Sequence, residues 1–346
     1  MRHDGIFRGV LLALSAAVAF GATVPLQRWA GAGLGAFTIA ALLYAGALLA
    51  AAVSSLIARD AGAPLNRSAI APLLLMGVFG AALAPSLFAW GVLHVDAPVA
   101  ALLLNFEMAW TAVLAFFIFR ETLGRRAVLG LLAMATGGAV LAVPSVDSHV
   151  SLTGVAAIVG ATVAWAIDNV ASRRLAEHRP LIVVASKSAI GASVSATLAL
   201  LFSEQRVAAW QFVVLLAAGA TGYGLSLRLY LLAQRSLGAT RTASVFSLAP
   251  FIGAVLGLVA GQGAWGWPLL GAGVLFALGA WLHATERHGH RHHHTALEHE
   301  HAHRHDDGHH FHHHDSVIVG EHTHAHRHEP HEHEHEHGPD LHHSHH

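Results

Sequence analysis

The chain has 346 residues, of which 54% are hydrophobic and only 12% are charged, and its formal net charge is -1. Soluble domains carry roughly 25% charged residues, so this composition excludes an ordinary soluble protein and indicates a polytopic helical protein in a lipid bilayer. The absence of cysteine excludes disulfides, thiolate metal sites and cysteine catalysis. The sequence shows no basic patch with interleaved aromatics for nucleic acid and no enzyme signature.

Apolar runs long enough to cross a ~30 Å hydrocarbon core follow one another along the chain. The first run follows Arg2 and Arg8 and has no small-residue cleavage site, so we interpret it as a retained helix rather than a signal peptide. The connections are short and hold proline and glycine. The ten predicted spans are 7–25, 34–58, 69–92, 97–119, 125–143, 152–171, 180–202, 210–233, 239–260 and 264–283.

The distribution of Lys and Arg between alternate loops predicts the orientation. One set of loops contains only Arg28 and Arg206. The imbalance predicts that both termini are cytoplasmic. The opposite, arginine-rich set contains Arg2, Arg8, Arg59, Arg67, Arg120, Arg125, Arg126, Arg173, Arg174, Arg179, Arg235, Arg241, Arg287 and Arg291.

An internal repeat divides the apolar part of the chain. An offset of about 145 residues matches Gly9 and Val10 to Gly154 and Val155. An offset of about 142 matches Gly80 to Gly222 and residues 112–114 to 254–256. Each half holds five spans, an odd number, so the halves face opposite ways, as in alternating-access transporters. The predicted fold is therefore an all-α membrane protein of ten transmembrane helices in two inverted five-helix repeats. Its predicted domains are 1–145, 146–285 and a disordered His-rich tail, 286–346.

Several stretches resemble the EamA-type permeases of the drug/metabolite transporter superfamily, in a subgroup with a histidine-rich tail. They are LLLNFEMAWTAVLAFFIFRE in the fourth span, WAIDNVASRR, SKSAIGA and SLGATRTASVFSLAPFIGA, and the resemblance covers about residues 6–283. It implies ten helices in the cytoplasmic membrane and the export or exchange of small metabolites. The resemblance does not supply the substrate.

Away from the first and last residues of the predicted spans, four charged residues remain: Glu107, Asp168, Lys187 and Arg228. Their formal charges sum to zero, as expected for groups that pair inside the bundle. Glu107 lies about ten residues into its span, near the midplane. A carboxyl group at that depth resists ionisation and can exchange protons near neutral pH, so Glu107 is the candidate proton-coupling residue. The alternative is a protonated, purely structural acid.

Each of the other three charged residues also has an alternative interpretation without a role in transport. Lys187 pairs with Glu107 or attracts an anionic substrate group, unless its long stem reaches the interface, as Arg228 can also do. Asp168 can instead pair with Arg173 or Arg174.

Asn105 and Trp110 lie beside Glu107 and complete the candidate substrate site; for Trp110, as for Trp90 and Trp165, plain helix packing is the alternative. Pro85 and Pro250 lie within spans and should interrupt their helices.

The tail holds most of the 31 histidines and no hydrophobic period, so we expect it to be disordered without metal. Neutral imidazole binds Zn, Ni and Co. Metal buffering, sensing or delivery, pH sensing and incidental binding all stay open, and no cofactor is required. The candidate ligands are His312, His313, His314, His331, His333, His335 and His337.

The first hypothesis for function is a proton-coupled or exchange transporter of a small-molecule metabolite; the sequence also allows a homodimer. The alternative is an efflux transporter for Ni, Co or Zn, with the tail gathering metal and Asn105, Glu107, Asp168 and Asn169 as oxygen ligands. The near absence of histidine from the spans and the positive charge of Lys187 argue against it. A metal sensor or store that does not transport leaves the repeat unexplained.

Overall fold

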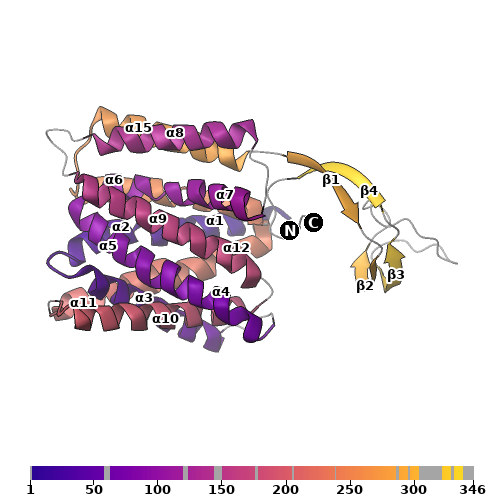
Figure 1. Ribbon diagram of the computed structural model, residues 1–346, viewed down its shortest axis with the longest axis horizontal. Helices are drawn as coiled ribbons and strands as arrows, with labels where there is room; N and C mark the ends of the chain where they lie inside the picture. Colours follow the sequence, from indigo (N-terminus) through magenta and orange to yellow (C-terminus); the bar gives the residue numbers. More distant parts are fainter. Residues whose placement is uncertain are drawn as a thin grey trace. The chain divides into compact units, whose positions relative to one another are not determined.

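The structure is a computed structural model. It describes residues 2–337 apart from 58–62, 120–123, 144–149, 176–177, 205, 238, 286–287, 295–296, 304–321 and 329–330. The chain divides into two compact units, one holding all the helices up to Glu286 and one formed by the tail from Arg287 to Pro339. The first unit, the membrane body, is helical throughout its described spans, which confirms the all-α prediction (Figure 1).

The helices of the first predicted half run back and forth between two ends of the body. Asn66 begins the third span, where its side-chain oxygen accepts a hydrogen bond from the Ala69 N–H at 3.1 Å. The elements are α1 (Arg2–Gly21), α2 (Thr23–Ala30), α3 (Ala36–Ile57), η1 (Arg67–Ala69), α4 (Ile70–Leu75), η2 (Met76–Leu83), α5 (Ala84–His94), α6 (Ala97–Leu103), α7 (Phe106–Phe119) and α8 (Arg125–Ala142).

The second predicted half has a similar series. Ser151 caps its first helix by accepting the Gly154 N–H at 3.4 Å. The elements are α9 (Leu152–Ser172), η3 (Arg173–Leu175), α10 (Pro180–Leu201), α11 (Ala209–Gly219), η4 (Ala220–Leu225), α12 (Ser226–Leu237), α13 (Ala239–Phe246), α14 (Ala249–Val259) and α15 (Trp267–Ala284).

Within the described residues, 9 helices are long and apolar enough to cross a membrane. They coincide with the first nine predicted spans. The tenth predicted span is occupied by α15, whose apolar stretch Trp267–His283 is shorter. The full set of ten membrane crossings therefore stays a prediction.

Several spans are interrupted rather than straight. η2 and η4 are π-helical turns, and Pro85 follows η2 directly. Pro250 lies in the first turn of α14, just after the break that separates it from α13. Both predicted interruptions are confirmed. A proline clashes with the carbonyl four residues earlier, and a π-turn or a break relieves that clash.

The interruption between α6 and α7 was not predicted, because no proline lies there. Asn105 takes the place of one: its backbone N–H and its side-chain Nδ2 both donate to the Leu102 carbonyl oxygen, at 3.1 and 2.8 Å. An asparagine side chain that bonds nearby backbone offers the chain an alternative to the helix. Glu107 consequently lies in the first turn of α7 and not in the middle of an unbroken helix, which corrects the sequence-based expectation.

The two halves pack against each other through matching contacts. α3 lies on α10, and α8 lies on α15 (Figure 1). α9 packs on η2 and α5, while α1 packs on η4 and α12. Glycines allow the closest approaches: a Cβ on Gly219 would lie 1.9 Å from the Leu43 carbonyl oxygen, and one on Gly46 would lie 2.1 Å from the Leu216 oxygen.

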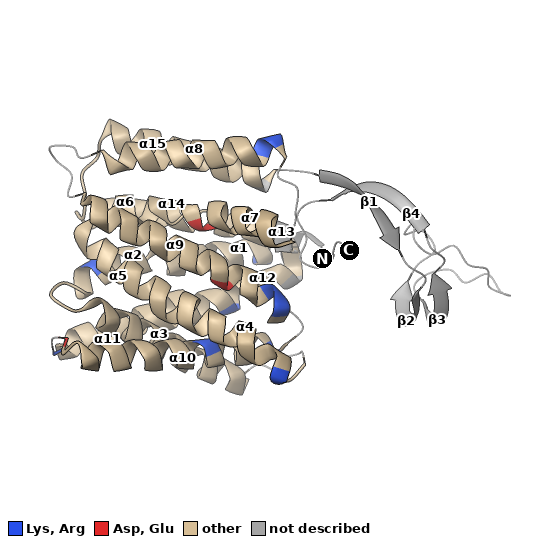
Figure 2. Ribbon diagram, viewed as in Figure 1, with Lys and Arg blue, Asp and Glu red and all other residues tan. Residues whose placement is uncertain are grey.

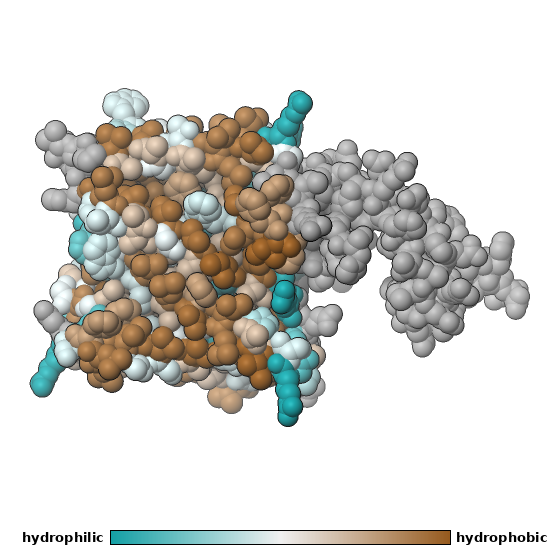
Figure 3. Space-filling model, viewed as in Figure 1, coloured by the Kyte–Doolittle hydropathy of each residue, from teal (hydrophilic) through white to brown (hydrophobic). Residues whose placement is uncertain are grey.

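The surface of the body is largely apolar on the face drawn in Figure 3. Large exposed side chains include Phe117 at 72% and Val274 at 67% exposure. A protein in water rarely leaves so much contiguous apolar area uncovered, whereas lipid covers it.

Most of the described Arg residues lie near the ends of the helices (Figure 2), whereas Lys187 and Arg228 lie within α10 and α12. One end, where α2 finishes and α3 begins, carries Arg28 and Arg206 and is called the Arg-poor end. The opposite, Arg-rich end carries Arg8, Arg67, Arg125, Arg126, Arg173, Arg174, Arg179 and Arg241.

The described residues of the tail pair as two short antiparallel ribbons, and its disorder in the absence of metal stays a prediction. β1 (His288–His294) pairs antiparallel with β4 (His331–His337), and β2 (Leu297–His303) pairs antiparallel with β3 (His322–His328). The alternating pattern of β4 had indicated an extended chain, which agrees with its strand. A two-stranded ribbon without a hydrophobic face is marginal in water, so the pairing does not imply a packed core.

Candidate functional site

Glu107 lies at the beginning of α7, directly after the break at Asn105. The half-buried Glu107 carboxylate oxygen Oε1 accepts a hydrogen bond from Asn169 Nδ2 at 2.8 Å. The Glu107 backbone N–H donates across the break to the Leu104 carbonyl oxygen at 3.0 Å, and the dipole of the helix that begins here favours a negative charge. The break therefore gives this carboxyl group a favourable position at the positive end of α7.

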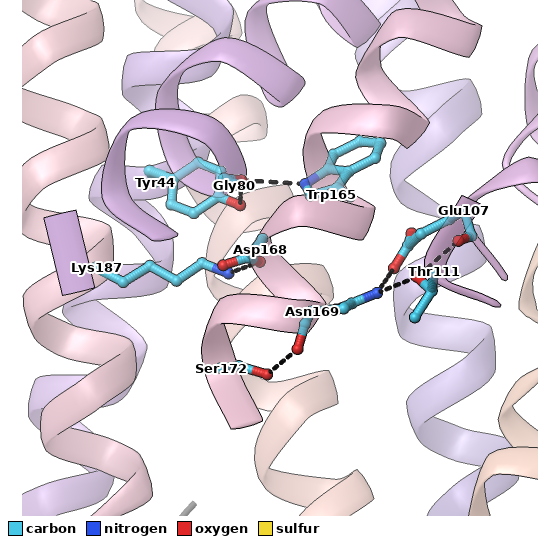
Figure 4. Close-up of polar contacts among 9 residues, drawn as sticks. All are labelled: Tyr44, Gly80, Glu107, Thr111, Trp165, Asp168, Asn169, Ser172 and Lys187. Carbon is cyan, nitrogen blue, oxygen red and sulfur yellow. Dashed lines mark hydrogen bonds and ion pairs between the residues drawn. The ribbon is translucent and has the colours of Figure 1, made fainter. Parts of the chain in front are cut away.

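Asn169 on α9 joins Glu107 to a second acceptor. Its Nδ2 also donates to Thr111 Oγ1 at 3.3 Å, and the Thr111 hydroxyl donates to the Glu107 backbone carbonyl at 2.8 Å (Figure 4). The amide of Asn169 is thus shared between the carboxylate and the hydroxyl. We had considered Asn169 only as a metal ligand, and its contact with Glu107 was missed.

Asp168, the preceding residue on α9, faces a different helix. Its Oδ2 forms an ion pair with Lys187 Nζ on α10, and the two side chains are 7% and 17% exposed. Successive residues on a helix are turned by about 100°, so α9 presents Asp168 to α10 and Asn169 to α7. Lys187 therefore pairs with Asp168 rather than with Glu107, and it does not extend to the interface.

The expected pairing of Asp168 with Arg173 or Arg174 is replaced by this contact with Lys187. The Arg173 guanidinium lies over the Phe119 ring instead, 4.6 Å from its centroid. Burial explains the choice, because an ammonium group inside the bundle needs a carboxylate partner more than a guanidinium at the helix end does.

Gly80 in the π-turn η2 supports the Asp168–Lys187 pair. A Cβ at Gly80 would lie 2.3 Å from Asp168 Cγ, so only glycine allows this approach. The Gly80 carbonyl oxygen accepts hydrogen bonds from Tyr44 Oη at 2.7 Å and Trp165 Nε1 at 3.1 Å (Figure 4). These contacts of Tyr44 and Gly80 were missed, although the repeat already matched Gly80 with Gly222.

The remaining predicted site residues lie apart from these contacts. Asn105 is 3% exposed and bonds its own helix end. The indole Nε1 of Trp110 is buried without a hydrogen-bond partner among the described residues. Arg228 is half-buried on α12 and has no ion pair with a described residue. Trp90, 38% exposed, stacks on His94 and does not line the site.

The proposed oxygen-ligand set for a metal is occupied by other contacts. Glu107 accepts from Asn169, and Asp168 is paired with Lys187, whose ammonium group repels a cation. In the part of the chain that the structure describes, no group of three or more His, Cys, Asp and Glu side chains could hold a metal ion. The efflux of divalent metals is therefore not supported.

The tail ligands cannot be placed. His312, His313 and His314 lie outside the described residues. His331, His333, His335 and His337 lie on β4, for which only the backbone pairing is described. Their role as metal ligands stays a prediction.

A bundle of apolar helices with interrupted spans and buried charges is typical of a multi-pass membrane protein. The EamA-like transporter family matches residues 7–143 and again residues 152–285, and the chain belongs to this family. The family that the resemblance had predicted is thereby confirmed.

Two individual proteins are similar to this chain. An uncharacterized transporter of Methanothermobacter thermautotrophicus is 27% identical over 179 residues, a match that covers 50% of this chain and 52% of that protein. The chain thus spans about half the length of this curated relative. A solved crystal structure covers 79% of this chain and 94% of its own, with a TM-score of 0.59 and 20% identity, and it supports the fold alone.

Proposed function

We propose that this protein is a secondary transporter that exports or exchanges a small metabolite by alternating access, coupled to protons through Glu107. The observation that carries the proposal is the position of Glu107: a carboxyl group inside the bundle, at a helix break, held by Asn169 on a helix that also carries the Asp168–Lys187 pair. Midplane helix breaks with ionisable groups suit substrate and proton sites in transporters.

Alternating access needs two halves related by inversion, and the packing supports this arrangement. Gly80 meets Asp168, and a Cβ on Gly222 would lie 1.9 Å from Thr23 Cγ2. The two contacts match at the offsets of 142 and 145 residues found in the sequence. The π-turns η2 and η4 and the breaks before α7 and α14 occupy matching places as well. The second half thus repeats the scaffold of the first, while Thr23 stands in place of Asp168.

The contacts of Asn169 give Glu107 a simple response to a proton. The ionised carboxylate accepts the amide N–H at 2.8 Å, and the Thr111 hydroxyl offers a second acceptor at 3.3 Å. Protonation weakens the carboxyl group as an acceptor, because a charged acceptor makes the stronger hydrogen bond. Asn169 then shifts toward Thr111, one turn further along the same helix α7, so that the proton changes where α9 is bonded to α7.

Proteoliposomes that contain a trapped pH dye test this role of Glu107. We would offer amino acids, organic acids and amines under an imposed pH gradient and record proton flux and substrate exchange. Glu107→Gln should abolish substrate-dependent proton flux, whereas substrate exchange measured in the absence of a pH gradient should persist. Glu107→Asp, which keeps a protonatable group, should retain coupled flux at a reduced rate. Full gradient-driven flux in Glu107→Gln would show that this role is wrong.

The orientation is part of the proposal. We place both termini in the cytoplasm, because the Arg-rich end of the body contains the beginning of α1 and the end of α15. The membrane is then a bacterial-type cytoplasmic membrane, and the tail faces the cytoplasm.

The tail has a separate, accessory role in this proposal. Its alternating sequence at His331–His337 forms the strand β4, and in a strand alternate side chains share one face. We expect such rows of imidazoles to bind Zn, Ni or Co at the tail.

A further inference from the structure

Side chains of the second half hold the backbone of the first half at the Arg-poor end. Gln211 on α11 donates from Nε2 to the carbonyl oxygens of Ala30 and Ala32, at 2.9 and 3.1 Å. These carbonyls lie at the end of α2, where no further helical N–H is available. Gln211 is 8% exposed, so these hydrogen bonds are shielded from water.

Glu204 makes the corresponding contact at the beginning of α3. Its carboxylate accepts the backbone N–H groups of Phe37 and Thr38, at 3.2 and 2.7 Å, and the Thr38 hydroxyl at 2.6 Å. A carboxylate at a helix N-terminus satisfies its free N–H groups and its dipole. This cap comes from the other half of the protein, 166 residues away in sequence.

Gln262, in the turn between α14 and α15, completes the set. Its side-chain Nε2 donates to the Pro25 carbonyl oxygen at 3.0 Å, and its backbone carbonyl oxygen accepts the Ala97 N–H at 3.2 Å. The three residues Glu204, Gln211 and Gln262 therefore tie α2, α3 and α6 of the first half to the second half. We call them the polar latch.

The repeat does not reproduce this latch at the Arg-rich end. The offsets of 145 and 142 residues place Arg59, Ala69 and Arg120 at the positions that match Glu204, Gln211 and Gln262. Alanine has no side-chain donor, and a guanidinium group cannot accept a hydrogen bond from a helix N-terminus. The two ends thus differ chemically, although the scaffold of the two halves is matched.

We propose that Glu204, Gln211 and Gln262 are gating residues, which hold the Arg-poor end closed and whose hydrogen bonds break when this end opens. The inference rests on the proposed alternating access but not on proton coupling by Glu107. Opening must separate α2 from α11, and the beginning of α3 from the connection between α10 and α11, because Gln211 and Glu204 join these elements directly. These side-chain hydrogen bonds then favour the closed state of the Arg-poor end.

The chain contains no cysteine, so single cysteines can report the opening. Thr23→Cys places a thiol at a site that is 1% exposed, about 7 Å beneath Arg28 along α2. Ala260→Cys, exposed at the end of α14, identifies the side of vesicles from which the Arg-poor end is reached. A membrane-impermeant maleimide added to that side measures how often the end opens.

Gln211→Leu and Gln262→Leu should each raise the labelling rate of Thr23→Cys, by about tenfold for Gln211→Leu, which loses two hydrogen bonds to the first half. Gln211→Leu also loses the bond from the Ala208 N–H to Gln211 Oε1, which lies within the second half. Thr221→Val is the matched control, because its hydroxyl bonds only carbonyls of its own helix. It should leave the labelling rate unchanged. Size-exclusion chromatography in detergent confirms that each variant is folded.

Unchanged labelling of Thr23→Cys in both folded variants would overturn the latch. The latch would also be overturned if Thr221→Val raised the labelling rate as much as Gln211→Leu does. The failure of proton coupling would look different: Glu107→Gln would keep its gradient-driven flux while the latch variants still labelled faster.

Discussion

Lys187 and Asp168 form an ion pair whose side chains are only 17% and 7% exposed. Replacing Lys187 by methionine keeps the length of the side chain and removes the charge, which leaves the Asp168 carboxylate buried without a counterion. Removing one partner of a buried pair costs about 3–5 kcal/mol. The residual exposure of Lys187 places this case at the lower end, about 3 kcal/mol.

The structure also predicts a rescue. In Lys187→Met/Asp168→Asn both charges are absent, and the neutral asparagine keeps the shape that fits against Gly80. We expect the double variant to recover most of the loss and to lie within about 1–2 kcal/mol of the wild type. Arg228→Met is the control, since Arg228 has no ion pair among the described residues, and it should change stability by under about 1 kcal/mol.

Thermal unfolding in detergent, followed by tryptophan fluorescence, measures these differences. A loss of about 3 kcal/mol corresponds to a fall in Tm of roughly 4–5 °C, given an unfolding entropy of about 2.1 cal/mol/K per residue over a chain of this length. The reasoning is refuted if Lys187→Met is as stable as the double variant, because the unpaired carboxylate would then carry no cost.

Two further predictions concern close packing and the tail. Gly80→Ala should lower the free energy of unfolding by about 1–3 kcal/mol, because the new Cβ would lie 2.3 Å from Asp168 Cγ, whereas Gly271→Ala, with nothing within 4 Å, should be neutral in the same thermal assay. Deletion of residues 287–346 should abolish the binding of Zn or Ni by the purified protein in titration calorimetry and leave substrate exchange in vesicles intact; metal binding that survives the deletion would contradict the proposed role of the tail.

The matching of glycines shows how far the repeat could be followed from the sequence. The offset of 142 residues paired Gly80 with Gly222, and both turned out to lie in π-turns against a side chain of another helix. The offset could not indicate which side chains these glycines contact. Asp168 and Thr23 differ in chemistry, and only the tertiary packing of α9 and of the segment from α1 into α2 brings them to the matched sites.

The helix break at Asn105 could not be predicted from the sequence. Proline marks an interruption wherever it occurs, because it lacks an N–H group and clashes with the preceding turn. Asparagine does so only where its side chain finds a backbone carbonyl, here that of Leu102. That choice depends on the local competition between two sets of hydrogen bonds, which the residue type alone does not decide.

The sequence by itself determined that this chain is a helical membrane protein, where most of its spans lie and which residues carry charge inside them. It could do so because lipid leaves backbone groups without partners and makes every buried charge conspicuous. Only the tertiary structure decided which charges meet. Asp168 and Asn169 are neighbours in sequence, yet a turn of about 100° directs one to Lys187 and the other to Glu107. The rotation of each helix is set by packing against all its neighbours, and that information is spread over both halves of the chain.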